Sequence, residues 1–263
     1  MYYEVKKYND NLYQLKDKLG VLSTLVIGDD KALVFDTCYG IGNLKEEVRK
    51  ITDKELIVIN SHGHMDHSCG NYQFDEVYIH PLDIELCKLH NNKAKKEENL
   101  KRVTFELPND FDKEKYINTG YGNLKEINYG DVISLGNLDL EVINMRGHTK
   151  GSIGLYIKKW KLLLASDAAC PFVWMFLKES TTVSEYIKML EEVLKLDFDS
   201  FLVGHGAIMY DKERMYAFYN VAKNIDVNKS QRMNYFGFED LEPYRFTLNG
   251  DESCGIVYDK NKL

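Results

Sequence analysis

The chain is poor in proline and has no long apolar run. Only four of its 263 residues are proline, and no segment approaches the roughly 18 consecutive apolar residues of a membrane-spanning helix. Residues 1–7 carry charges but no apolar run behind them, a pattern from which we do not expect a signal peptide. We therefore expect a soluble, cytoplasmic protein without a membrane partner.

The cysteines show no pairing pattern. Their number is odd, they are widely spaced, and no C-x-x-C motif occurs; they are Cys38, Cys69, Cys87, Cys170 and Cys254. This usage fits a reducing compartment, where thiols stay reduced. We expect packed or inert thiols.

The chain also has fewer positive than negative side chains, with 34 lysines and arginines against 41 aspartates and glutamates. The formal net charge of −7 and the pI of about 5.6 disfavour a general affinity for nucleic acid, because proteins that bind phosphates usually present a basic face. A composition with 44% hydrophobic and 29% charged residues is that of an ordinary folded protein. Since no linker or low-complexity segment interrupts it, we expect a single domain over residues 1–263.

Two blocks of the sequence repeat one plan of strands and a helix. Helices are predicted at residues 43–51 and 183–195, where apolar positions recur at helical spacing. Strands are predicted where apolar residues alternate or run on, at residues 11–15, 23–27, 32–35, 56–59, 138–143, 153–157, 161–165 and 198–203. The charged stretch 90–128 between the blocks is a candidate flap. Residues 211–263 add a helix and a hairpin around residues 249–251 as a C-terminal decoration.

Potential metal ligands follow strand after strand. The residues concerned are Asp36, His62, His148, Asp167 and His205. Ligand types at the ends of successive strands imply one edge of a layered sheet, which is where α/β proteins build their sites.

The strongest local signal is the segment His62-Gly63-His64-Met65-Asp66-His67. Three imidazoles and a carboxylate within six residues cannot all reach one closed tetrahedral ion, but they can serve two adjacent ions. The sequence therefore predicts a dinuclear metal site.

Taken together, the motifs resemble the metallo-β-lactamase superfamily. The resemblance covers roughly residues 10 to 210. It rests on H-x-H-x-D-H at residues 62–67, Gly147-His148-Thr149 with Gly151-Ser152, Asp167, Gly204-His205-Gly206, and Asp36 upstream. It implies an α/β fold, the four-layer αβ/βα sandwich, with two metal ions at the sheet edge.

The resemblance also implies a role for each ligand. The first metal is assigned His62, His64 and His148, and the second is assigned Asp66, His67 and His205. Asp167 would bridge the two ions, and Asp36 would support the metal loop without touching metal. Two departures, Ser166 for glycine and Arg146 for proline, remove no ligand. Zinc is the expected metal, with iron or manganese as alternatives, because histidine and aspartate accept all three.

Other chemically able residues receive plainer interpretations. We take His80 and His90 as structural histidines. Cys170 is taken as a packed thiol, because the second metal has a full ligand set without it. The apolar run 172–177 is interpreted as packing, although its place after a ligand also allows a pocket wall.

Two divalent ions can generate a hydroxide nucleophile from water near neutral pH, and Asp66 would orient it and shuttle a proton. We expect hydrolysis of a small ester, lactone or thioester. A phosphodiesterase or nuclease of the same fold is the alternative enzyme, disfavoured by the lack of an extra domain or basic arm. A metal-binding module whose pocket is closed by residues 90–128 is the non-catalytic alternative. Iron redox chemistry is disfavoured by His64, because a glutamate there would suit iron. The exact substrate and the oligomeric state stay open.

Overall fold

Apolar alternation near the N-terminus produces the sheet of the first of two structural units. The computed structural model describes residues 1–206 and 208–263. Unit 1 comprises Met1–Val142 and the short segment from Gly204 that carries His205. Unit 2 comprises Ile143–Val203 and the chain from Ile208 to Leu263. The expectation that residues 1–263 form a single domain stays a prediction.

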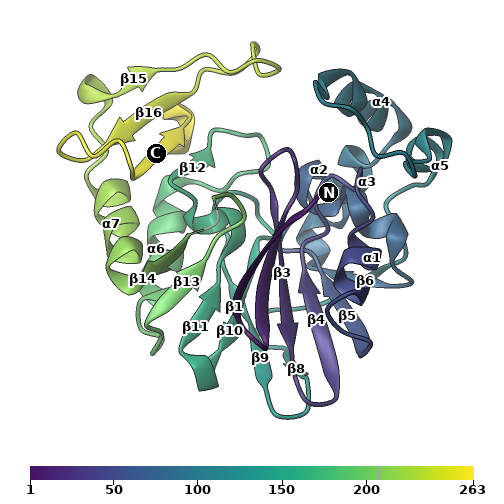
Figure 1. Cartoon of the computed structure of the whole chain (residues 1–263). Helices are drawn as coiled ribbons and strands as arrows, with labels where there is room; N and C mark the ends of the chain where they lie inside the picture. The colour runs from purple at the N-terminus through teal and green to yellow at the C-terminus, as the bar shows by residue number, and fades with distance from the viewer. Residues whose placement is uncertain (207) are drawn as a thin grey trace. The chain divides into compact units, whose positions relative to one another are not determined.

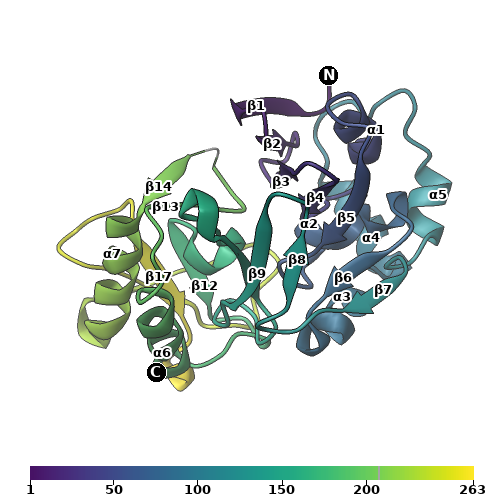
Figure 2. The ribbon, with the colours of Figure 1, turned by 90° about the horizontal axis from the view of Figure 1, so that it is seen from below.

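Unit 1 is built on a seven-stranded sheet in sequential order. Its strands are β1 (Glu4–Asn9), β2 (Leu12–Lys16), β3 (Leu22–Ile27), β4 (Lys31–Phe35), β5 (Glu55–Ile59), β6 (Val77–Ile79) and β7 (Leu124–Glu126). The strands from β1 to β4 pair antiparallel, and those from β4 to β7 pair parallel, so that β5, β6 and β7 run side by side (Figure 2). The carboxyl ends of β4 and β5 therefore lie at one edge, where Asp36 and the histidine loop follow.

Five α-helices belong to unit 1 among its described residues: α1 (Leu44–Arg49), α2 (Met65–Ser68), α3 (Ile84–His90), α4 (Lys93–Arg102) and α5 (Lys113–Asn118). The 3-10 helices η1 (Cys69–Gln73) and η2 (Pro81–Asp83) join them, and β8 (Val132–Ser134) pairs antiparallel with β9 (Asp139–Asn144). The predicted helix at 43–51 is α1, whose first turn is capped by the Asn43 side chain. Helix α1 makes the crossover that parallel pairing of β4 with β5 requires.

The stretch 90–128, expected as a flap, carries α4 and α5, which lie side by side (Figure 1). Its charge does not mean that it is exposed throughout. Lys96 is fully buried, and its Nζ donates to the carbonyl oxygens of Thr119 and Gly120 at 2.7 and 3.1 Å. The rings of Tyr72 and Tyr116 lie within 5.3 Å of the same nitrogen, and burial lowers the Lys96 pKa. Whether this stretch covers a pocket stays a prediction.

Unit 2 contains two groups of paired strands. The first has the order β14-β13-β11-β10, with β10 (Ile153–Ile157), β11 (Leu162–Leu164), β13 (Ser200–Leu202) and β14 (Met209–Asp211). The second has the order β12-β17-β16-β15, with β12 (Phe172–Met175), β15 (Gln231–Arg232), β16 (Tyr244–Thr247) and β17 (Gly255–Tyr258). Strand β16 joins β17 as the antiparallel hairpin predicted around residues 249–251.

Helices α6 (Val183–Val193) and α7 (Lys212–Lys223) pack together in unit 2, as Figure 1 shows. Helix α6 begins with a capping box, in which Thr182 and Glu185 satisfy each other's backbone N–H groups. Its buried face, which includes Tyr186 and Leu190, joins the core of unit 2. The predicted helix 183–195 is thus confirmed. Short 3-10 helices complete the unit: η3 (Lys158–Trp160), η4 (Ser166–Ala169), η5 (Val227–Lys229) and η6 (Lys260–Lys262).

The described part of the chain shows the burial of the cysteines and the character of the helices. All five cysteines are buried thiols, as predicted. Among the described helices, none has both the length and the apolar character that crossing a membrane demands.

Candidate metal centre

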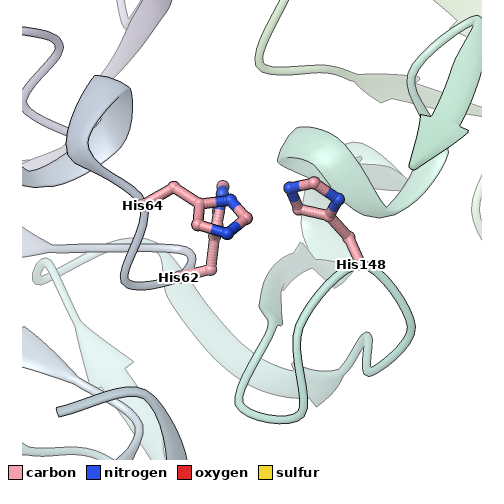
Figure 3. Close-up of side chains that lie close together, drawn as sticks. All are labelled: His62, His64 and His148. Carbon is pink, nitrogen blue, oxygen red and sulfur yellow. The ribbon is translucent and has the colours of Figure 1, made fainter. Parts of the chain in front are cut away.

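Three histidines gather in unit 1 just after β5. The ring centres of His62 and His64 are 4.7 Å apart, and those of His62 and His67 are 4.3 Å apart. Figure 3 shows the His62 and His64 rings side by side at the end of this loop. All three side chains are buried; His62 and His64 lie on the loop after β5, and His67 lies in α2. The structure thus brings together the histidines of the predicted cluster.

Asp66 forms a second group with His67 and His205. One Asp66 oxygen lies 3.5 Å from His67 Nε2 and 3.3 Å from His205 Nε2. His205 is brought to α2 by a β-bridge with Val21 and by a 2.9 Å hydrogen bond from the Leu22 N–H to the Gly204 carbonyl. Burial alone would raise the Asp66 pKa, but the two imidazoles outweigh it, and the pKa lies well below its usual range. Asp66 is therefore ionised at neutral pH.

Asp36 connects two of the histidines. It lies directly after β4 with a φ of 70°, in the left-handed region that aspartate tolerates better than most residues. Its carboxylate accepts from the Ser61 N–H at 2.7 Å, from the Ser61 hydroxyl at 2.8 Å and from His67 Nδ1 at 2.9 Å. The Ser61 oxygen in turn lies 2.9 Å from His62 Nδ1.

These bonds fix the tautomers of His62 and His67. Since the Ser61 hydroxyl gives its proton to Asp36, its oxygen accepts from His62 Nδ1–H, and His67 Nδ1–H donates to Asp36 directly. Each neutral ring then carries its lone pair on Nε2. A carboxylate that orients histidines in this way is the usual support of a metal ligand.

Two further predicted ligands lie in unit 2. The ring of His148, drawn in Figure 3, extends from the turn before β10, and its Nδ1 lies 2.8 Å from the Trp174 carbonyl oxygen on β12. Because a carbonyl only accepts, Nδ1 carries the proton and Nε2 the lone pair. Asp167 follows β11 on η4, with one oxygen 3.9 Å from His148 Nε2. Cys170 Sγ lies 3.4 Å from the other Asp167 oxygen, so this thiol contacts a predicted ligand.

The donor set fits divalent metal ions. Unit 1 supplies His62, His64, Asp66, His67 and His205 at short mutual distances, and unit 2 supplies His148 and Asp167. Imidazoles and carboxylates are ligands of zinc, iron and manganese, and three of the imidazoles have their Nδ1 fixed by a neighbour. The assignment of His148 to the first metal and of Asp167 as the bridge joins residues of both units and stays a prediction.

The two histidines interpreted as structural differ in their surroundings. His80 stacks on Tyr129 with ring centres 4.1 Å apart and accepts the Leu82 N–H as the N-cap of η2, the turn that ends at Asp83. His90 instead stacks on His64, with ring centres 5.0 Å apart and planes inclined by 23°. Nothing near His90 in the sequence indicates this contact, because α3 brings it back to the loop from 26 residues beyond His64.

Comparisons with known proteins give one family. The family model described as "Metallo-beta-lactamase superfamily" matches residues 17–205. A human protein named "Acyl-coenzyme A thioesterase MBLAC2" is 26% identical over 197 residues, which cover 65% of this chain and 66% of the relative. The protein of the same name from Gallus gallus is 27% identical over 206 residues, covering 73% and 74%. The match thus spans just under two thirds of the human relative's length.

Solved structures show the same fold at low sequence identity. The DIM-1 metallo-beta-lactamase has a TM-score of 0.60 at 14% identity, covering 85% of this chain and 97% of that one. The sec-alkylsulfatase Pisa1 from Pseudomonas sp. has a TM-score of 0.65 at 15% identity, covering 84% and 42%. The predicted α/β fold is confirmed. With more than half of its residues matched by the family model, the chain belongs to the metallo-beta-lactamase superfamily.

Proposed function

We propose that this protein is a metal-dependent hydrolase of thioesters, with acyl-coenzyme A as its substrate class. The observation that carries the proposal is the cluster of His62, His64, Asp66, His67 and His205, with Asp36 orienting two of its imidazoles. The sequence left ester, lactone and thioester open. The names of the human and chicken relatives favour the thioester.

The proposed ligand sets are those that the resemblance implies. His62, His64 and His148 would hold one ion, and Asp66, His67 and His205 the other, with Asp167 between them. We propose zinc, with iron or manganese as the alternatives that the same donors accept. A cytoplasmic location is part of the proposal, supported by five buried thiols that suit a reducing compartment.

The chemistry divides between metal and protein. Bound divalent ions supply Lewis acidity, which lowers the pKa of water to near 7 and polarises a carbonyl oxygen. Asp66, kept ionised by its histidine neighbours, accepts a hydrogen bond from the attacking water and orients it. The leaving group of a thioester is a thiolate, whose conjugate acid has a pKa of about 8.5, so it departs without a strong general acid. Hydrolysis of a thioester therefore needs no separate general acid beyond the proposed metal ligands.

Aromatic side chains beside His148 suit an apolar acyl group. They form the β12 aromatic cluster, defined as Phe172, Trp174, Phe176, Tyr235 and Phe238. The Trp174 ring lies 4.9 Å from Tyr235 and 5.7 Å from Phe238, while its own carbonyl holds His148. Trp174 is half-buried, so part of its ring offers apolar surface in the residue whose carbonyl holds a proposed ligand. A phosphodiester would favour cationic side chains instead.

Metal analysis tests the first part of the proposal. Purified protein is expected to contain about two equivalents of divalent metal, because seven donors are more than one tetrahedral ion can accept. Elemental analysis of protein as isolated, and again after chelation and reconstitution with zinc, measures this directly. A stoichiometry of one or less after reconstitution contradicts the dinuclear site.

A substrate panel tests the reaction. We expect turnover of acyl-coenzyme A thioesters to exceed that of aliphatic esters, lactones, β-lactams and bis-p-nitrophenyl phosphate, and chelation to abolish it. Thiol release, followed with and without chelator, gives the comparison. Preference for the phosphodiester would favour a phosphodiesterase, and full metal content without any turnover would favour a non-catalytic metal-binding module.

A further inference from the structure

Helix α3 and the residues at its two ends contact the backbone of the ligand loop. At the first end, the buried carboxylate of Asp83 accepts the Gly63 N–H at 2.9 Å. Gly63 has no room for a side chain, because a Cβ there would lie 2.7 Å from the Asp83 carbonyl oxygen and 2.8 Å from the Cys87 nitrogen. The loop between His62 and His64 thus lies directly against the start of α3.

At the other end of α3, His90 meets the start of α2. The N-cap residue of α2 is His64, whose side chain makes no capping hydrogen bond. The Met65 N–H, one of the amides that a helix start leaves without an intrahelical partner, donates to His90 Nδ1 at 3.3 Å. His90 therefore supplies the acceptor that the N-cap side chain does not, and its ring lies against the His64 ring.

Asn91, the residue after His90, holds the backbone carbonyl of His64 through the Ser68 hydroxyl. Asn91, 1% exposed, donates from Nδ2 to Ser68 Oγ at 2.8 Å. The Ser68 hydroxyl donates to the His64 carbonyl oxygen at 2.8 Å. The amides on both sides of His64 and its own carbonyl are thus held from α3.

We infer that Asp83, His90 and Asn91 form a brace that positions His64 for metal binding. Asp36 orients His62 and His67 through side chains, whereas the brace acts on the backbone and the ring of His64. Fixing the backbone of a loop residue costs conformational entropy, and a brace formed before metal binding removes that cost from the binding step. We assign these three to positioning rather than to metal binding, because Asp83 Oδ2, His90 Nδ1 and Asn91 Nδ2 are each engaged with the ligand loop or with Ser68. The inference rests on the proposed metal site but not on the proposed substrate.

Metal affinity of His90 variants tests the brace. We expect His90→Ala to lower the affinity for one metal equivalent by about 10- to 100-fold, which is the usual effect of removing a residue that supports a ligand. The affinity for the other equivalent should stay unchanged. Competition between protein and a chromophoric zinc chelator measures both affinities. His90→Phe keeps an aromatic ring against His64 but removes the Nδ1 acceptor of the Met65 N–H. It fills the space that alanine leaves empty, so it provides the test if the alanine variant fails to fold. Asp83→Ala is expected to behave like His90→Ala, and Asp83→Asn, which keeps an oxygen for Gly63, to restore affinity.

Asn43→Ala is the matched control. Like His90, the Asn43 side chain accepts a backbone N–H at the start of a helix, that of Glu46 in α1, at 3.1 Å. This variant should lower the stability of the protein without changing its affinity for either metal equivalent. If His90→Ala or His90→Phe, folded by circular dichroism, binds both equivalents like Asn43→Ala, the brace is refuted. A wild-type protein that binds metal but cleaves no thioester refutes the proposed substrate and leaves the brace standing. A wild type that binds no metal refutes both.

Discussion

His64→Ala and Asp167→Ala are expected to lower kcat/KM for thioester hydrolysis by about 10³-fold, because metal polarisation contributes several kcal/mol and each 1.36 kcal/mol is worth a factor of ten. Both variants should also lose metal. The fold should survive, since His64 lies on a loop after β5 and Asp167 on η4 after β11, outside the strands. Steady-state rates, elemental analysis and circular dichroism on the same samples give the three readouts.

Asp197→Ala is the carboxylate control for Asp167→Ala. Asp197 lies in the same unit, its side chain is 76% exposed, and its partner is Lys161. It should keep wild-type rates and metal content. Wild-type activity in His64→Ala or Asp167→Ala would disprove the ligand assignment, and unfolding of either variant would show that metal also holds the structure together.

Asp36→Ala is expected to lower the free energy of unfolding of the metal-free protein by about 3–5 kcal/mol, the cost of removing one side of a buried polar network. The substitution removes the acceptor for the Ser61 N–H, the Ser61 hydroxyl and His67 Nδ1 together. It also places alanine at a φ of 70°, which alanine adopts less readily than aspartate. Metal affinity should fall by about 10- to 100-fold as the two histidines lose their orientation.

Urea denaturation in chelator, followed by zinc titration, separates the two effects of Asp36→Ala. Asp36→Asn is the matched variant, because asparagine tolerates the same backbone conformation and keeps one acceptor oxygen. We expect it to recover part of the stability but little of the metal affinity. A metal-free Asp36→Ala protein as stable as wild type would contradict the network described for this residue.

The sequence was sufficient to predict the fold and the proximity of the histidines in residues 62–67. The H-x-H-x-D-H segment carries its ligands within six residues, so its spacing alone indicates that they lie close together. The strand periods were equally informative, because residues 56–59 and 153–157 form β5 and β10 as predicted. Family and fold are confirmed by the comparisons. The hydrolase prediction agrees with the activity named for the relatives.

Asp36 was implied as a support by the family resemblance, but the other supports of these residues could not be predicted, for two physical reasons. His148 is held by a backbone carbonyl, that of Trp174, and any residue offers a carbonyl, so no sequence pattern marks it. His90 reaches His64 through the path of α3, which is a long-range contact without a local period. Lys96 shows a third limit, since a lysine in a charged segment predicts exposure, whereas two carbonyls and two aromatic rings make its burial possible.

The parallel pairing of β12 with β17 has a consequence for the order in which the protein is made. The carbonyl of Trp174 holds His148, and Trp174 on β12 pairs with Val257 on β17. Val257 lies beyond the family match, which ends at residue 205. The hydrogen bonds described above that hold His62, His64 and His67 come from residues between Asp36 and Asn91, which leave the ribosome long before β17. Because a chain emerges N-terminus first, the early histidines can be arranged while β12 still lacks its neighbour. We therefore expect maturation of the proposed ligand set to be staged. A nascent chain stalled before β17 should present arranged histidines in unit 1 while β12, which holds His148, still lacks its partner strand.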